Sequence, residues 1–376
     1  MAASKDVGAN CFLNSPYKEK IFGPNPTTIR GEGTHVSFHP KENSIVYPSG
    51  RYIIFKNLDK PSDCFIYRGH NHTATVAKVS PNGYWVASGD VSGKLRVWSW
   101  DNPEHLTKLE YPAFSGPIHD IDWGDESKKI VVVGEGSGVM AKVITWDTGN
   151  SAGEMLGHSK RILSCAFKPT RPYRIFSCAE DFKVCFFSGP PFKLQHSRQP
   201  FTNFANCIRY SPDGKFAVCV GEKKIQLFDG ATGEETICVE KAHEGTVYSA
   251  SWNPDSTKFA TAAADKTVKV WNLALECLVV HSFANVVGEM QVSVCWTKTS
   301  LVSVALNGNI TVLNTEAAGP LGPPLQDHQV QRHDSISVSC FMELQNSVSC
   351  MCYDQTTNIL YTGDNFGVIL SRNIDT

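Results

Sequence analysis

The residues best suited to chemistry are His243, Thr261 and Asp265, which offer an imidazole, a hydroxyl and a carboxylate. Hydrolases use residues of these kinds as base, nucleophile and orienting acid. Partial copies of the set recur along the chain. The histidines are His70 and His158, the hydroxyls are those of Ser88, Ser177 and Ser303, and the acid is Asp181. Because an enzyme needs one active site rather than several, the recurrence favours a structural role.

We predict that the most complete copy forms a buried hydrogen-bond network. In it Asp265 accepts from His243, the hydroxyl of Thr261 relays, and the indole N–H of Trp271 completes the line. Buried polar groups without partners cost about 1–3 kcal/mol each, so the paired network stabilises the fold. Other copies are expected to be incomplete, because non-matching residues stand where acids or hydroxyls are expected, at Ser92, Val218, Glu222 and Asn307.

The remaining motifs predict no catalytic, metal or cofactor site. The glycine-rich stretch 134–138 lacks the spacing of a phosphate-binding loop and no helix is predicted after it. Strand and loop positions explain the histidine pairs His35/His39 and His70/His72 more simply than a metal does. Asp120 and Asp122 are interpreted as ordinary loop or strand residues. The protein is therefore predicted not to be an enzyme.

The composition is that of a soluble globular protein. Apolar residues make up 41% of the 376 residues, charged residues 19%, and the net charge is −2. This balance argues against disorder and against nucleic-acid partners. No apolar run reaches the ~18 residues of a membrane span, and the N-terminus does not have the pattern of a secretory signal. The 13 cysteines contain no CxxC pair, which favours reduced thiols in the cytoplasm.

A repeat of about 42 residues must position these side chains. Its last strand ends at Phe55, Trp98, Trp146, Phe187, Phe228, Trp271 and Leu313, with spacings of 43, 48, 41, 41, 43 and 42. Each unit is predicted to contain short strands rich in Val, Ile, Phe and Thr. Turns such as 80–83, 211–214 and 253–256 follow the first strand. Four short strands in such a period are typical of a β-propeller blade, which is stable only between neighbouring blades.

We therefore predict an all-β, seven-bladed propeller over 26–318. A further unit near the C-terminus lies beyond an irregular stretch, 318–335, that we interpret as a linker. The predicted domains are an N-terminal extension with one orphan strand (1–25), the propeller, and a linker with an incomplete extra blade (319–376).

The repeats, the histidines at blade starts and the pair Trp146–Asp147 resemble the WD-repeat family. Five stretches further resemble the actin-interacting protein 1 family: 88–98, 130–138, 168–177, 188–193 and 253–259. The resemblance spans about 17–318. It implies a cytoplasmic protein of the actin-rich cortex that binds actin filaments decorated with cofilin and promotes severing, disassembly and end capping.

The resemblance also implies contact residues on one rim, which are Glu180, Phe204, Phe192, Leu194 and Glu135. Leu194 stands where the family usually has an aromatic residue, and Gly138 where it has an acid. The residues alone leave alternatives open: Phe204 as core packing, Glu180 as a solvated turn acid, and Phe192 as an exposed anchor or a plug beneath its loop.

The chain departs from that family in one respect, because family members have two rings. The strand 17–22, which resembles the one that completes the second ring, lacks its usual partner here. We expect 1–25 and 319–376 to pack loosely or to pair irregularly, and the chain to be a truncated or spliced product. The alternative function is a generic WD-repeat adaptor in a ubiquitin-ligase or signalling complex.

Overall fold

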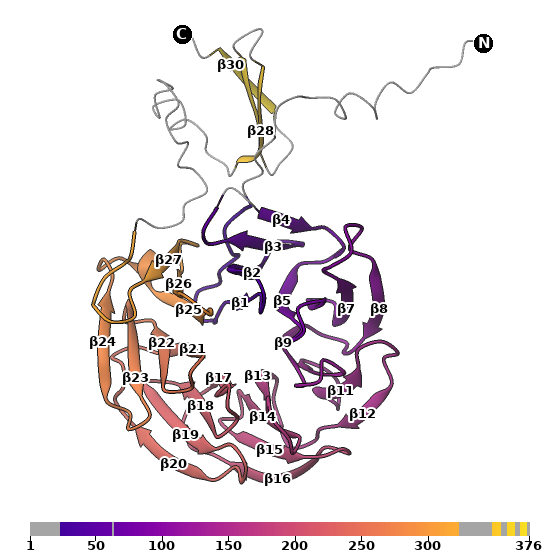
Figure 1. Ribbon diagram of the computed structural model, residues 1–376, viewed down its shortest axis with the longest axis vertical. Helices are drawn as coiled ribbons and strands as arrows, with labels where there is room; N and C mark the ends of the chain where they lie inside the picture. Colours follow the sequence, from indigo (N-terminus) through magenta and orange to yellow (C-terminus); the bar gives the residue numbers. More distant parts are fainter. Residues whose placement is uncertain (1–22, 62–63, 323–347, 355–358, 365–368, 374–376) are drawn as a thin grey trace, which may run out of the picture. The chain divides into compact units, whose positions relative to one another are not determined.

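Seven antiparallel sheets are arranged in a ring around a central channel, as the prediction requires (Figure 1). The computed structural model describes residues 23–61, 64–322, 348–354, 359–364 and 369–373. The first three blades comprise β1 (Ser37–Phe38), β2 (Ser44–Ser49), β3 (Tyr52–Asn57) and β4 (Cys64–Tyr67); β5 (Ala74–Val79), β6 (Trp85–Asp90), β7 (Lys94–Ser99) and β8 (Thr107–Pro112); and β9 (Ile118–Trp123), β10 (Lys129–Gly134), β11 (Ala141–Thr145) and β12 (Ser151–Glu154).

The next three blades also have four strands each. They are β13 (Ile162–Phe167), β14 (Arg174–Ala179), β15 (Val184–Ser188) and β16 (Lys193–Arg198); β17 (Ala205–Tyr210), β18 (Phe216–Gly221), β19 (Lys224–Asp229) and β20 (Glu235–Val239); and β21 (Val247–Trp252), β22 (Lys258–Ala263), β23 (Thr267–Asn272) and β24 (Cys277–Ser282). A short 3₁₀ turn, Val287–Glu289, precedes blade seven, which comprises β25 (Gln291–Trp296), β26 (Leu301–Ala305) and β27 (Ile310–Leu313).

A second unit, His328–Thr376, contains a separate sheet. It is an antiparallel meander of β28 (Val348–Asp354), β29 (Ile359–Asp364) and β30 (Ile369–Asn373). That this sheet is part of an incomplete extra blade stays a prediction, as do the boundaries at 25 and 318. The expected behaviour of 1–25 and 319–376 falls largely outside the described residues.

The core lies between the blades, because each sheet packs apolar side chains on both neighbours. The middle strands are therefore almost fully buried: β10, for example, places Ile130–Val133 entirely inside. Long apolar runs without helical periodicity explain why the described residues contain no α-helix. No helix in this part of the chain is long and apolar enough to cross a membrane.

Polar side chains on the first strands link each blade to the next around the channel. The hydroxyl of Ser37 donates to the Ala77 carbonyl at 2.8 Å, and that of Thr75 to the Ile118 carbonyl at 2.6 Å. Between blades three and four, the Ser164 hydroxyl donates to the Asp120 carboxylate. The Asn206 amide donates to the Val247 carbonyl between blades five and six, and the Ser249 hydroxyl donates to the Val294 carbonyl between blades six and seven. Blade seven is joined to the segment before β1 by a main-chain bond instead, in which the Thr34 amide donates to the Val292 carbonyl at 3.1 Å.

Alternating strand directions give the ring two faces. The loop before each first strand and the turn between the second and third strands lie on one face, which we call the entry face. The turns after the first and third strands lie on the opposite, exit face. In the turns 80–83 and 211–214, the predicted glycines Gly83 and Gly214 have φ of 75° and 72°.

Candidate functional site

The His243 set forms a continuous hydrogen-bonded line in blade six. His243 Nδ1 lies 2.9 Å from Asp265 Oδ2, and its Nε2 lies 2.8 Å from Thr261 Oγ1. The indole N–H of Trp271 donates to Thr261 Oγ1 at 2.9 Å. Thr261 is completely buried, and its oxygen is already engaged by an imidazole and an indole. A hydroxyl held in this way cannot reach a substrate, so the geometry is that of a structural network.

Blade two contains the same network with a different acid. His70 Nδ1 lies 3.1 Å from Asp90, its Nε2 lies 2.7 Å from Ser88, and the Trp98 indole donates to Ser88 at 3.2 Å. The expectation that Ser92 leaves this blade without its acid was therefore wrong. Asp90, two residues earlier, supplies the carboxylate, and Ser92 donates to it. The network thus requires a carboxylate within reach of the histidine Nδ1, and that carboxylate need not stand at one fixed position of the repeat.

Blade four shows the limit of the pattern, because it has the acid and hydroxyl but no indole. His158 pairs with Asp181 at 3.0 Å and with Ser177 at 2.8 Å, while Phe187 occupies the position of the tryptophan. Burial lowers the pKa of His158, but hydrogen bonds with Asp181 and Cys185 outweigh it and raise the pKa to about 9. The imidazolium and its carboxylate therefore form a buried ion pair.

Two of the predicted contact residues lie close together on the entry face. Glu180 begins the turn between β14 and β15, and its carboxylate forms an ion pair of 2.7 Å with Arg161. Phe204 immediately precedes β17 and remains 40% exposed, so it is not packed in the core. Its ring stacks on that of Phe182 with a centroid distance of 6.1 Å. The Lys160 ammonium lies over the face of the Phe182 ring, 5.7 Å from its centroid.

The other predicted contact residues lie elsewhere. Glu135 is exposed in the loop after β10, also on the entry face. Leu194 is exposed on β16, the outermost strand of blade four, near its exit-face end. Phe192 was named as a contact residue, but it is only 3% exposed and packs against Phe167 in the core. The plug beneath its loop, one of the two interpretations above, is what the structure contains.

Sequence reasoning missed Phe182 and Arg161. Phe182 has φ of 69°, an unusual value for a bulky side chain, in the turn after Asp181. Phe182 could have been singled out in the sequence, because it is an aromatic residue at a turn position that favours glycine or asparagine. Arg161 could not have been found in this way, because its role follows only from the fold.

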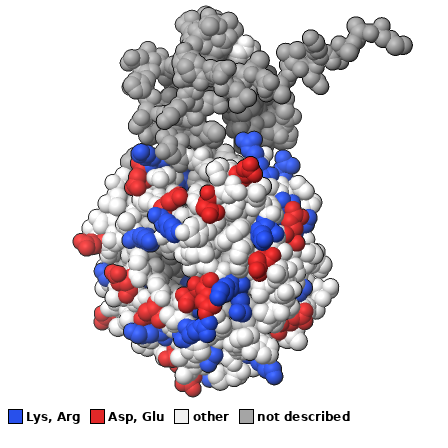
Figure 2. Space-filling view, turned by 45° about the vertical axis from the view of Figure 1, so that its right-hand side comes forward, with Lys and Arg blue, Asp and Glu red and all other residues white. Residues whose placement is uncertain are grey.

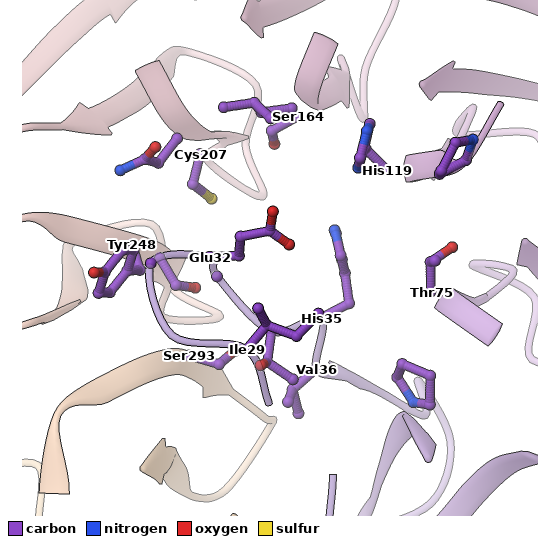
Figure 3. Close-up of a pocket in the computed structure, with 18 of the residues that line it drawn as sticks. Ile29, Glu32, His35, Val36, Thr75, His119, Ser164, Cys207, Tyr248 and Ser293 are labelled. Atoms are coloured by element: carbon purple, nitrogen blue, oxygen red, sulfur yellow. The ribbon is translucent and has the colours of Figure 1, made fainter. Parts of the chain in front are cut away.

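A hollow of about 500 Å³ opens at the channel and is lined by residues from most blades. The segment before β1 runs through it: Figure 3 shows Glu32 and His35 projecting into the hollow, between Tyr248 on one side and Thr75 and His119 on the other. Ser164 lies at its wall.

Asp120 was interpreted as an ordinary loop or strand residue; it does lie on strand β9, but its side chain forms a buried ionic network that the sequence did not reveal. It is 1% exposed and accepts hydrogen bonds from Arg209 at 2.7 Å, from Ser164 at 2.7 Å and from the Cys165 amide. The nearby cation Arg209 and the imidazole of His35 hold the pKa of Asp120 far below its usual range despite burial. Burial in turn lowers the pKa of His35 to about 4. Asp120 is the charged centre of the inter-blade linkage.

On the face drawn in Figure 2, basic and acidic side chains are interspersed and neither sign dominates. Among the described residues, no group of three or more histidines, cysteines and acids is arranged to hold a metal ion. The arrangement on the entry face is therefore suited to polypeptide contact through aromatic and charged anchors.

Comparison with known proteins agrees with the repeat analysis. Residues 62–99, 149–188 and 234–272 match the WD domain, G-beta repeat family. The chain is 37% identical over 369 residues to WD repeat-containing protein 1 of Gallus gallus, covering 97% of the chain and 58% of that protein. It is 39% identical over 343 residues to the Bos taurus protein of the same name, covering 90% and 56%.

A third relative carries a more informative name. The chain is 37% identical over 361 residues to Actin-interacting protein 1 of Drosophila melanogaster, covering 95% of the chain and 57% of that protein. The chain thus spans somewhat more than half the length of these curated relatives. By its fold and matched repeats the chain is a β-propeller with WD repeats, and along 90–97% of its length it is similar to proteins named WD repeat-containing protein 1 and Actin-interacting protein 1.

Proposed function

We propose that this propeller binds actin filaments and cooperates with cofilin to sever and disassemble them. The observation that carries the proposal is the similarity along 90–97% of the chain to proteins that include one named Actin-interacting protein 1. The site of action is then the actin-rich cortex of the cytoplasm. No cofactor is required by this function.

The entry face supplies suitable contacts. Phe204, which is 40% exposed, stacks on the half-buried Phe182, and the Glu180–Arg161 ion pair and the exposed Glu135 lie on the same face. Aromatic and charged anchors of this kind dominate the energy of protein interfaces. A platform that binds a cofilin-decorated filament more tightly than a bare one shifts the filament toward its decorated, twisted state and so toward breakage.

Cosedimentation tests the proposal. Purified full-length chain is pelleted with actin filaments, with and without cofilin, and both bound chain and unpelleted actin are measured. We expect cofilin to increase both quantities. Phe204→Ser should weaken cofilin-dependent binding about tenfold, whereas Leu278→Ser, at an exposed leucine on β24, should leave it unchanged.

The alternative is a generic WD-repeat adaptor, which the three matched repeats also allow. The two functions differ in this experiment. If cofilin changes neither the bound chain nor the unpelleted actin, the adaptor function replaces the one proposed.

A further inference from the structure

Three aromatic side chains lie together on the exit face at the edge of blade two. Tyr84 is in the turn after β5, and Trp85 is the first residue of β6. Successive strand residues point to opposite faces of a sheet, so Tyr84 faces blade one and Trp85 faces blade three. There the Trp85 ring meets that of Trp146, which follows β11, at a centroid distance of 4.3 Å. We call Tyr84, Trp85 and Trp146 the exit-face aromatic cluster.

The protein covers this cluster only in part. Tyr84 is 46% exposed, and Trp85 and Trp146 are half-buried. The residues that directly precede the second strand in blades five, six and seven, as Tyr84 does in blade two, are Lys215, Thr257 and Ser300. The fold therefore does not require an aromatic residue at this position. Exposed tyrosine and tryptophan side chains are characteristic of binding interfaces, because each combines a large apolar surface with a polar group.

The tryptophans of the cluster have unused hydrogen-bond donors. Within the described part of the chain the indole N–H groups of Trp85 and Trp146 have no acceptor, and both nitrogens are accessible to solvent. Trp100, on the same face, differs, because its indole N–H donates to the carboxylate of Glu42 at 3.0 Å. The two free indoles are therefore available to an acceptor from outside the chain.

The charged group beside the cluster is also a donor. The ammonium of Lys41 lies 3.5 Å from the centroid of the Tyr84 ring and pairs with no carboxylate among the described residues. Asp147, which is exposed and follows Trp146, adds one acceptor at the edge of the cluster. The cluster thus presents aromatic faces with several free donors, and a ligand rich in acceptors and poor in donors complements it.

We infer that the exit-face aromatic cluster binds a proline-rich segment in the polyproline II conformation. Proline has no N–H group, and the carbonyls of this conformation make no internal hydrogen bonds, so the segment supplies acceptors without competing donors. Aromatic-lined surfaces recognise such segments because proline rings pack against aromatic faces. The indoles of Trp85 and Trp146 donate to carbonyls of the segment, and a proline ring packs on Tyr84.

This inference goes beyond the proposed function and uses another surface. Phe204 and Glu180, the contact residues proposed for the filament, lie on the entry face, whereas the aromatic cluster lies on the exit face. The test of the inference contains neither actin nor cofilin. Either proposal can therefore fail while the other holds.

The experiment uses fluorescein-labelled decaproline, titrated with the full-length chain and followed by fluorescence anisotropy. A glycine–serine repeat and a glycine–glutamate repeat of the same length serve as comparison peptides. We expect saturable binding of decaproline, and binding of the other two that is weaker by about tenfold or more, because flexible chains without proline rings lose entropy and contacts on binding. Binding of decaproline should not depend on salt, because no ion pair contributes to it.

Matched variants locate the site. Tyr84→Ser should weaken binding of decaproline about fivefold, and Phe204→Ser, at a similarly exposed aromatic residue of the entry face, should not. Trp85→Phe and Trp146→Phe retain a ring but remove the N–H donor, and each should weaken binding about fivefold, which corresponds to the loss of one hydrogen bond.

The indole N–H resonances report on binding directly. In nitrogen–proton correlation spectra of the full-length chain, decaproline should shift the indole resonances of Trp85 and Trp146, each assigned by its absence from the corresponding phenylalanine variant. The indole resonances of Trp252 and Trp271 should not shift, because both donate to acceptors inside the protein.

Four outcomes overturn the inference: no saturable binding of decaproline, equal binding of either comparison peptide, equal effects of Tyr84→Ser and Phe204→Ser, or unshifted Trp85 and Trp146 resonances. Circular dichroism melting of each variant verifies folding. Because Tyr84 is exposed, its substitution is expected to change the melting temperature little. The binding data for Tyr84→Ser and the spectra of the unmodified chain keep the test decisive even where a tryptophan variant is destabilised.

Discussion

The guanidinium of Arg209 lies 2.7 Å from the carboxylate of Asp120, a residue 89 positions earlier in the chain. The first belongs to blade five and the second to blade three, and Ser164 of blade four hydrogen-bonds to both. One ion pair therefore links three consecutive blades at the inner edge of the ring. Arg209 and Ser164 also line the central hollow.

Asp120→Ala is expected to destabilise the propeller by about 3–5 kcal/mol, because it leaves the Arg209 charge without its buried partner. Urea unfolding followed by tryptophan fluorescence measures the change. Asp125→Ala, at an exposed turn acid of the same blade, serves as the control and should change stability by less than about 0.5 kcal/mol. Equal effects of the two variants would show that the ion pair is not needed for stability.

Asp265→Ala should lower the melting temperature while binding at the entry face survives. The substitution leaves His243 Nδ1 without its carboxylate, at a cost of about 1–3 kcal/mol. Differential scanning calorimetry measures the effect, with Asp255→Ala in the exposed turn of the same blade as control. An unchanged melting temperature would contradict the structural role of the network.

The contribution of Asp90 should disappear in acid. Burial raises its pKa, but hydrogen bonds from His70, Ser92 and the Lys94 amide outweigh burial and lower the pKa to about 2. In the unfolded chain the pKa is about 3.9, so the unfolded state binds the proton first as pH falls. The stabilisation is therefore present above about pH 4 and is lost between about pH 4 and pH 2.

The difference in unfolding free energy between wild type and Asp90→Asn isolates this effect. Measured in urea from pH 7 to pH 2.5, the difference should be constant above about pH 5 and shrink below it. A difference that stays constant over the whole range would show that Asp90 gains no stability from its ionised form.

Substitution of Phe192 should cost much more stability than substitution of Phe204. Phe192→Ala removes a buried ring that packs on Phe167 and is expected to cost about 3–5 kcal/mol. Phe204→Ala removes an exposed ring and should cost less than about 1 kcal/mol. Thermal unfolding measures both; similar destabilisation by the two variants would show that Phe204 is part of the core.

The contact residues predicted from the family resemblance show that sequence comparison does not predict which side chains are buried. The predicted contact set contained both Phe192 and Phe204, and each lies immediately before a strand. Only the packed structure separates them, since burial depends on side chains brought in from other strands. The Phe182–Phe204 pair likewise joins two loops 22 positions apart that become neighbours through blade packing.

The sequence by itself determined the all-β architecture, the number of blades and the membership of the His243 network. These features are local or repeated. The composition of a few residues indicates a strand, and the same weak pattern recurs seven times with a period near 42 residues. The tertiary structure alone decided that Asp90 replaces the acid expected at Ser92 and that Asp120 is a buried charged centre. The first depends on how the turn of blade two folds around His70. The second depends on the packing of blades three to five, which brings together residues 89 positions apart. No residue spacing within a single repeat predicts either arrangement.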